Sequence, residues 1–105
     1  MSGSGGGSFT DDTPSSCESL VVNTQISSPK TQVTQNIVVG TILEVAVEQT
    51  NNVTIVVVKH QNQTAGGVAS PVVQRLRECI QQGTVYRATV TAVNGPQISI
   101  RIEAS

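Results

Sequence analysis

The chain has 105 residues and a formal net charge of −1, with 37% hydrophobic and 12% charged residues. This length fits one domain, and so few charges exclude the dense basic surface that a strong phosphate binder needs. The longest apolar run, VTIVVV, has the length of a strand and not of a membrane span, and no signal peptide opens the sequence. We therefore expect a cytoplasmic protein without membrane contact.

Residues 1–16 consist largely of Gly, Ser, Thr and Asp. Such a segment buries too little apolar surface to offset the entropy cost of ordering it, which predicts a mobile tail. Residues 17–105 are then a single small β-barrel domain. Val, Ile and Thr are abundant there and suit pleated, half-buried surfaces, whereas aromatic residues are almost absent, so the composition favours strands.

The first predicted element covers residues 20–26, where apolar residues precede the turn-forming pair Ser28-Pro29. This pattern predicts an edge strand or an extended arm. The next segment, TQVTQN at residues 31–36, is polar and predicts a loop or a weak strand.

Two strands joined by a turn follow. Alternating apolar residues from Leu43 to Val47 share one face of the first strand, and the second strand is apolar on both faces, which predicts a central position. Because directly opposed residues share a face, pairing Val47 with Val53 buries one consistent surface. This register predicts an odd-length or bulged loop across Gln49–Asn52 and not a two-residue turn.

The stretch HQNQTAGGVASP, residues 60–71, leads from these strands towards a helix. His60 closes the second strand. Gly66 and Gly67 lie in a short third strand and allow a bend or a close backbone approach. The glycine pair lacks the Lys-Ser/Thr of a phosphate-binding loop and the spacing of a dinucleotide fingerprint, so we interpret the stretch as a connector.

One helix is predicted at about residues 71–82. Ser70 is a good N-cap, Pro71 a good first helical residue, and Gly83 a good stop. Its apolar stripe includes Cys79, one of only two cysteines. We favour a small buried side chain for Cys79. The alternative is a Cys17–Cys79 bridge, which fastens the N-terminal segment to the helix and needs an oxidising compartment.

The last predicted element is a hairpin of strands Tyr86–Val93 and Ile98–Ile102. A three-residue loop, Asn94–Pro96, buries all of its apolar residues on one side. This register places Ile98, Ile100 and Ile102 opposite Ala92, Val90 and Ala88, and Arg87 opposite Glu103.

The element order is strand, strand, short strand, helix, strand, strand, with an extra strand near the N-terminus. One helix after the third of five strands matches the order of OB-type barrels. We therefore predict a mainly β fold, an OB-like barrel of five to six strands with one helix. The alternative is an α+β rolled sheet capped by one helix.

Catalytic groups are scarce. His60 is the only histidine, and the only aspartates, Asp11 and Asp12, lie in the predicted tail, so a Ser-His-Asp arrangement is hard to build. Glu44 and Glu48 stand about 13 Å apart on a strand, too far for a glycosidase pair. Cys17, Cys79 and His60 lack the spacing of a zinc site. We therefore expect that the protein is not an enzyme and that it binds neither a metal ion nor a cofactor.

Basic residues are concentrated in the second half of the chain and offer a modest nucleic-acid surface. Tyr86 is the one aromatic residue of the predicted domain, and by alternation it faces the core, so base stacking is not favoured. The candidate nucleic-acid-binding residues are Lys59, Arg75, Arg77, Arg87 and Arg101.

Residues 65–102 combine a glycine step at Gly67-Val68, a helix at Pro71–Gln82, a stop at Gly83 and the strand hairpin described above. This arrangement resembles the C-terminal half of HIRAN domains. The resemblance implies an OB-like barrel and a role near DNA processing, with binding to single-stranded DNA ends. The family's acidic, Asn-containing stretch between the early strands is absent, and Val68 stands where the family has an aromatic residue. The resemblance therefore carries over the fold and no binding residues.

We interpret the chain as a non-enzymatic β-barrel module that binds an unidentified protein partner and is itself a monomer or a weak homodimer. Exposed strand edges near residues 20–26 are the expected route to pairing with a partner or a second copy. The alternative is weak binding of single-stranded nucleic acid by the basic residues.

Overall fold

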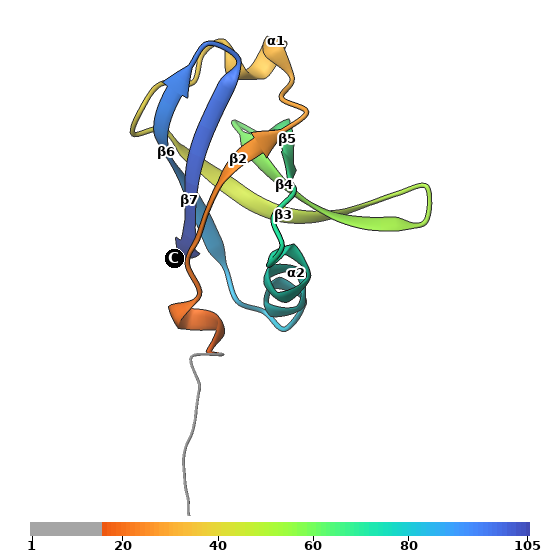
Figure 1. Cartoon of the computed structure of the whole chain (residues 1–105). Helices are drawn as coiled ribbons and strands as arrows, with labels where there is room; N and C mark the ends of the chain where they lie inside the picture. Colours follow the sequence, from red (N-terminus) through yellow and green to blue (C-terminus); the bar gives the residue numbers. More distant parts are fainter. Residues whose placement is uncertain (1–15) are drawn as a thin grey trace, which may run out of the picture.

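The computed structural model describes residues 16–105 and shows a closed barrel of six antiparallel strands in the order β2-β5-β4-β3-β6-β7 (Figure 1). The predicted tail, residues 1–16, lies outside the described residues except for Ser16. The strands are β2 (Val22–Ser27), β3 (Ile42–Thr50), β4 (Val53–His60), β5 (Gln63–Val68), β6 (Tyr86–Asn94) and β7 (Gln97–Ala104). The helical segments are η1 (Cys17–Ser19, a 3-10 turn), α1 (Thr31–Thr34) and α2 (Val73–Gln81).

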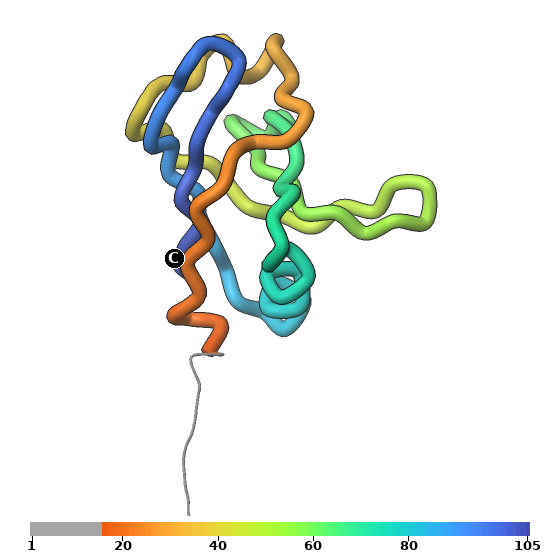
Figure 2. Tube along the Cα trace, viewed as in Figure 1, coloured from red at the N-terminus to blue at the C-terminus, as the bar shows by residue number. Residues whose placement is uncertain are grey.

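The mainly β, OB-like barrel predicted from the sequence is confirmed. Three consecutive strands, β3 to β5, precede α2, and the hairpin of β6 and β7 follows it. The path of the chain in Figure 2 shows β2 crossing between the two groups of strands. Because the strands close into a ring, the alternative of an open rolled sheet does not apply.

β2 lies between β5 and β7 in the ring, so the prediction of an edge strand or an extended arm is wrong, although Val22–Gln25 pair with a strand on one side only. β2 pairs with β7 over Val22–Gln25 and then with β5 at Ile26 and Ser27. The strand changes its partner partway along its length. The apolar pattern of β2 correctly predicted a strand. So short a pattern does not reveal which strands lie beside β2 in the sheet.

The prediction for residues 31–36 is also wrong, since residues 31–34 form the short helix α1. The amides of Val33 and Thr34 both donate to the carbonyl of Lys30 at 2.9 Å. Val33 is buried and ties this turn to the core. A single apolar side chain in a polar segment gives no periodicity from which a helix is predictable.

The first hairpin has a different register from the predicted one. Its turn consists of two residues, Asn51-Asn52, and both have positive φ, 51° and 66°. This conformation suits Asn and matches the twist of a hairpin, so the turn sets the register. Val47 pairs with Val56 and not with Val53. The prediction failed because β4 is apolar on both faces, so its alternation does not distinguish the two registers.

The second hairpin keeps the predicted pairs Val90–Ile100 and Ala88–Ile102, and Arg87 lies opposite Glu103 as expected. The loop differs from the prediction, because Asn94 pairs with Gln97 across a two-residue turn.

The predicted pairing of Ile98 with Ala92 is wrong, because Ile98 pairs with Val93. A bulge between Val90 and Ala92 shifts the register. The bulge adds the residue that the prediction assigned to the loop, so the isoleucines still face the core.

Helix α2 begins at Val73, two residues later than predicted. Ser70 nevertheless supports this end, since its Oγ accepts from the Val72 amide at 3.3 Å and its carbonyl from the Val73 amide at 2.9 Å. Gly83, with φ 108°, follows the helix and ends it as predicted.

The core fills the inside of the ring with aliphatic side chains. β4 is central, as predicted, and three consecutive valines of it, Val56 to Val58, are buried. The largest fully buried side chains are Tyr86, Leu43, Leu76, Ile100, Ile102, Val56, Val57, Val58, Val90 and Cys79.

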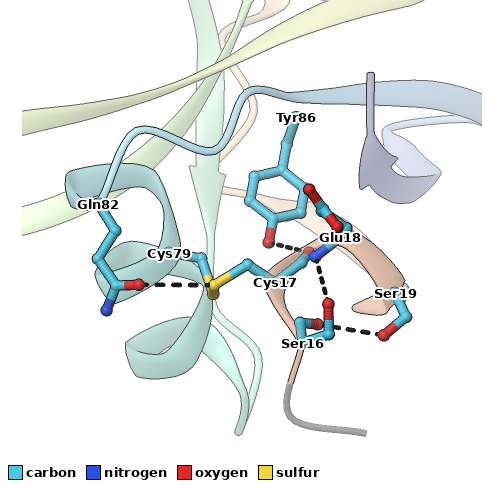
Figure 3. Close-up of a disulfide and its surroundings, with 7 residues drawn as sticks. All are labelled: Ser16, Cys17, Glu18, Ser19, Cys79, Gln82 and Tyr86. Carbon is cyan, nitrogen blue, oxygen red and sulfur yellow. Dashed lines mark hydrogen bonds between the residues drawn. A yellow bond between two sulfur atoms is a disulfide. The ribbon is translucent and has the colours of Figure 1, made fainter.

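A disulfide joins Cys17 to Cys79, with 5.6 Å between their Cα atoms (Figure 3). The favoured interpretation of Cys79 as an unbridged side chain is therefore wrong, although its burial was predicted correctly. The bond fastens η1 to α2. The Gln82 Oε1 atom lies 3.9 Å from the Cys17 sulfur. A disulfide sulfur has no hydrogen to donate, so this contact is one of packing.

Gly66 allows β5 to approach β2 closely, as the sequence predicted. A Cβ atom at this position would overlap Ile26 Cγ2 and lie 2.8 Å from the carbonyl oxygen of Ser27. At the neighbouring Gly67 the nearest atom to such a Cβ is the Val56 carbonyl oxygen, at 3.6 Å, an ordinary contact.

Removal of the disulfide should destabilise the fold strongly. The Cys17→Ala variant breaks the bridge and leaves the buried Cys79 side chain in place. The two cysteines are 62 residues apart, and a loop of this length predicts a loss of about 4 kcal/mol. Urea unfolding followed by circular dichroism measures the loss. Reductant should destabilise the wild type and leave Cys17→Ala unchanged, and equal stability of the two proteins without reductant would contradict this role.

Gly66→Ala and Gly67→Ala form a matched pair that tests the close approach of β5 to β2. The Cβ of Gly66→Ala needs β2 to move, which should cost about 1–3 kcal/mol of unfolding free energy. Gly67→Ala should cost less, because its Cβ meets only ordinary contacts. Urea unfolding compares both with the wild type, and a larger loss for Gly67→Ala would disprove the explanation.

Candidate interaction surface

The β3–β4 hairpin projects beyond the barrel (Figure 1). β3 pairs with β6 only from Ile42 to Glu44, and β4 pairs with β5 only from Val57 onwards. Residues 45–56 therefore form a two-stranded arm, which we call the ribbon. Near its tip Val53 is 56% exposed and Ile55 is 37% exposed.

A cleft of about 500 Å³, here called the ribbon groove, lies at the base of the ribbon. One wall is β4 with Ile55 and Val57, and the other is β5. Gly67 lies opposite Val57, and both residues line the cleft. The remaining lining residues are Ser27, Ser28, Lys30, Glu48, Thr50, Val56, Thr64, Gly66, Val68 and Ala69.

Two charged residues line the ribbon groove, Lys30 and Glu48. The Glu48 carboxylate is paired with Lys59 Nζ at 3.3 Å and accepts a hydrogen bond from Thr64 Oγ1 at 3.4 Å. Lys30 is exposed and makes no ion pair with the residues of the described range 16–105. The groove thus combines an aliphatic floor with one ammonium group available at its rim.

The predicted basic residues on strands do not form a basic groove. Lys59 and Arg87 both lie opposite Glu44, and Arg87 also lies opposite Glu103. Charges of opposite sign therefore alternate across β4, β3, β6 and β7. Arg101 continues the pattern, with its Nε 3.8 Å from the Glu103 carboxylate. Such alternation lowers the attraction for a phosphate backbone.

The two predicted basic residues on α2 lie apart from this row. Arg77 donates to the backbone carbonyl of Thr54 at 3.4 Å, which links the helix to β4. Arg75 lies close enough to Tyr86 to lower the pKa of that phenol in part.

Tyr86 is a core residue, as the sequence predicted, and only 2% of it is exposed. Its hydroxyl donates to the carbonyl of Cys17 beside the disulfide (Figure 3). Burial raises the pKa of Tyr86 above its ordinary value of 10.0, and the positive charge of Arg75 only partly opposes this shift.

His60 ends β4, as expected, beside the turn to β5. Residues 16–105 contain no cluster of three His, Cys, Asp or Glu side chains that would hold a metal ion. In the same part of the chain, no helix is long and apolar enough to cross a membrane.

The groove residues Lys30, Ile55 and Gly67 were not predicted as a site. The continuous apolar run of β4 indicated burial for all of its valines and for Ile55. The sequence therefore did not reveal that Val53 and Ile55 are exposed. Gly67 was the one available signal, because glycine in a strand marks a close approach or an unfilled space.

Comparisons with known proteins found no matching family model, no matching curated protein and no matching solved structure. The resemblance to HIRAN domains therefore stays a prediction from the sequence.

The stability of the fold should fall as pH rises above 10, partly because of Tyr86. The folded state holds this phenol neutral while the unfolded state ionises at the lower, ordinary pKa, so alkali favours unfolding. Tyr86 is the only tyrosine, so ultraviolet absorbance of the phenolate reports on it alone. The titration midpoint should be higher for the folded than for the urea-unfolded protein.

The Tyr86→Phe variant is the control for this pH dependence. At neutral pH it should lose about 1 kcal/mol, because the Cys17 carbonyl loses its hydrogen bond. Above pH 10 its unfolding free energy should fall less steeply than that of the wild type. Coincident midpoints for folded and unfolded wild type would show that burial does not control this phenol.

Proposed function

We propose that this chain is a non-enzymatic OB-like module that binds an extended segment of another protein in the ribbon groove. The observation that carries the proposal is the open groove between β4 and β5, next to an arm with exposed Val53 and Ile55. Exposed aliphatic side chains beside a cleft are typical of binding surfaces.

The lining of the groove favours an extended polypeptide as its occupant. Ile55, which is 37% exposed, offers an apolar side chain in the groove, and Gly67, which also lines it, has no side chain to occupy that space, so an aliphatic side chain of the partner packs there. The ammonium group of Lys30 then pairs with a carboxylate of the same segment, because the other charge of the groove, Glu48, is neutralised by Lys59. The partner is therefore an extended segment with aliphatic and acidic residues.

The disulfide supports a location other than the predicted cytoplasm. Disulfides persist in oxidising compartments and are rare in the cytosol. The Cys17–Cys79 bond therefore favours a periplasmic, luminal or extracellular site of action for this module.

Selection from a displayed library of random linear peptides tests the proposal. The full chain should enrich peptides that combine aliphatic and acidic residues. Binding of the selected peptides should be lost in Ile55→Asp and weakened up to about fivefold in Lys30→Ala, the loss of one exposed ion pair.

Val85→Asp is the matched control, since Val85 is 67% exposed and lies outside the groove. It should bind the selected peptides as the wild type does. Failure to enrich any peptide, or equal loss in Val85→Asp and Ile55→Asp, would refute the groove as the binding site. A parallel titration with labelled oligothymidylate, in which tight binding weakens steeply with salt, would favour the nucleic-acid alternative.

A further inference from the structure

We infer that the open edge of β3 in the ribbon pairs with the same edge of a second copy of this chain, as antiparallel strands about a two-fold axis. This inference concerns the side of the ribbon opposite the groove and does not depend on the proposed function.

The register shows which backbone groups are available on that edge. In a hairpin closed by a two-residue turn, the residues flanking the turn hydrogen-bond to each other, and every second pair after them does so. Thr50, Glu48 and Ala46 therefore direct their backbone groups at β4. Val47 and Gln49 direct theirs away from β4, and no strand of the described range pairs with them there, because the pairing of β3 with β6 ends at Glu44.

The other edge of the ribbon is covered. Thr54 is the partner of Gln49 across the hairpin, so its backbone groups also point outwards. Its carbonyl accepts the hydrogen bond from Arg77 of α2. Natural sheets protect their edges with charged side chains, prolines or bulges. The β4 edge has such a protection. Residues 45–50 contain no Pro, their pairing with β4 has no bulge, and their one charged residue, Glu48, is paired with Lys59 of β4.

Within the ribbon, one edge is open, that of β3, and this favours the same edge of a second copy as the occupant. Two identical edges pair about a two-fold axis and close, whereas two open edges would propagate into a filament. When the two-fold axis is perpendicular to the sheet, the residue of β3 that lies on the axis pairs with the same residue of the second copy. With Val47 on the axis, Glu48 lies opposite Ala46 and the two Glu48 carboxylates do not oppose each other. Each of them is also paired with Lys59 of its own chain.

A pair of proline variants tests the inference. Gln49→Pro removes the outward amide of the β3 edge, and Thr54→Pro removes the outward amide of the β4 edge directly across the hairpin. Neither amide bonds within the hairpin, so both variants should fold, which circular dichroism checks. In sedimentation of the full chain over a wide concentration range, the wild type and Thr54→Pro should reach twice the chain mass, while Gln49→Pro should stay at the monomer mass.

Amide hydrogen exchange gives a second readout. Protection of the Gln49 amide should rise with concentration in the wild type, while the Thr54 amide should stay unprotected. A wild type that remains monomeric at every concentration, or a Gln49→Pro variant that dimerises like the wild type, would overturn the inference. Because peptide selection uses the Ile55 side of the ribbon, a failure there leaves this result standing, and the reverse also holds.

Discussion

Closure of the barrel by β2 is the constraint on which the rest of the structure depends. β2 fills the gap between β5 and β7, yet its pairing with β5 involves only Ile26 and Ser27. So short a pairing requires the two backbones to come close, and Gly66 permits it by having no side chain. At the other end of β2, the disulfide and the hydrogen bond from Tyr86 hold the preceding η1 turn against the barrel. Two separate sets of contacts thus secure the two ends of the strand that closes the ring.

Closure also determines where strand edges remain open. β3 has nine residues, but its pairing with β6 uses only the first three of them, Ile42 to Glu44. The excess length of β3 and β4 has no neighbour in the ring and projects as the ribbon. In a closed barrel, edges remain only where strands are longer than their neighbours. The open edge of the ribbon is therefore a consequence of unequal strand lengths.

The sequence predicted the strands, the helix and their order, because these depend on local alternation, caps and turn-forming residues. The register of the first hairpin was predicted wrongly because two local signals conflicted. At Asn51-Asn52 the turn chemistry favoured a two-residue turn and the apolar pattern favoured a longer one, and the turn prevailed because the apolar pattern of β4 fits both registers. The disulfide was left as an alternative for another reason. Spacing along the chain does not reveal that Cys17 and Cys79 meet, since η1 and α2 come together only in the closed fold.

The two faces of the ribbon carry different chemistry because its two strands have different neighbours. β4 lies beside β5 and α2, so its outward backbone is partly covered by Arg77 and its exposed side chains border a groove. β3 has β6 beside it only near the barrel, so its outward backbone is bare from Val47 to Gln49. The β4 side therefore offers mainly side chains to a partner, and the β3 side offers backbone hydrogen-bonding groups. Since Glu48 and Lys59 form an ion pair across the ribbon, the charge of the arm is balanced within one chain, and neither side repels an approaching strand.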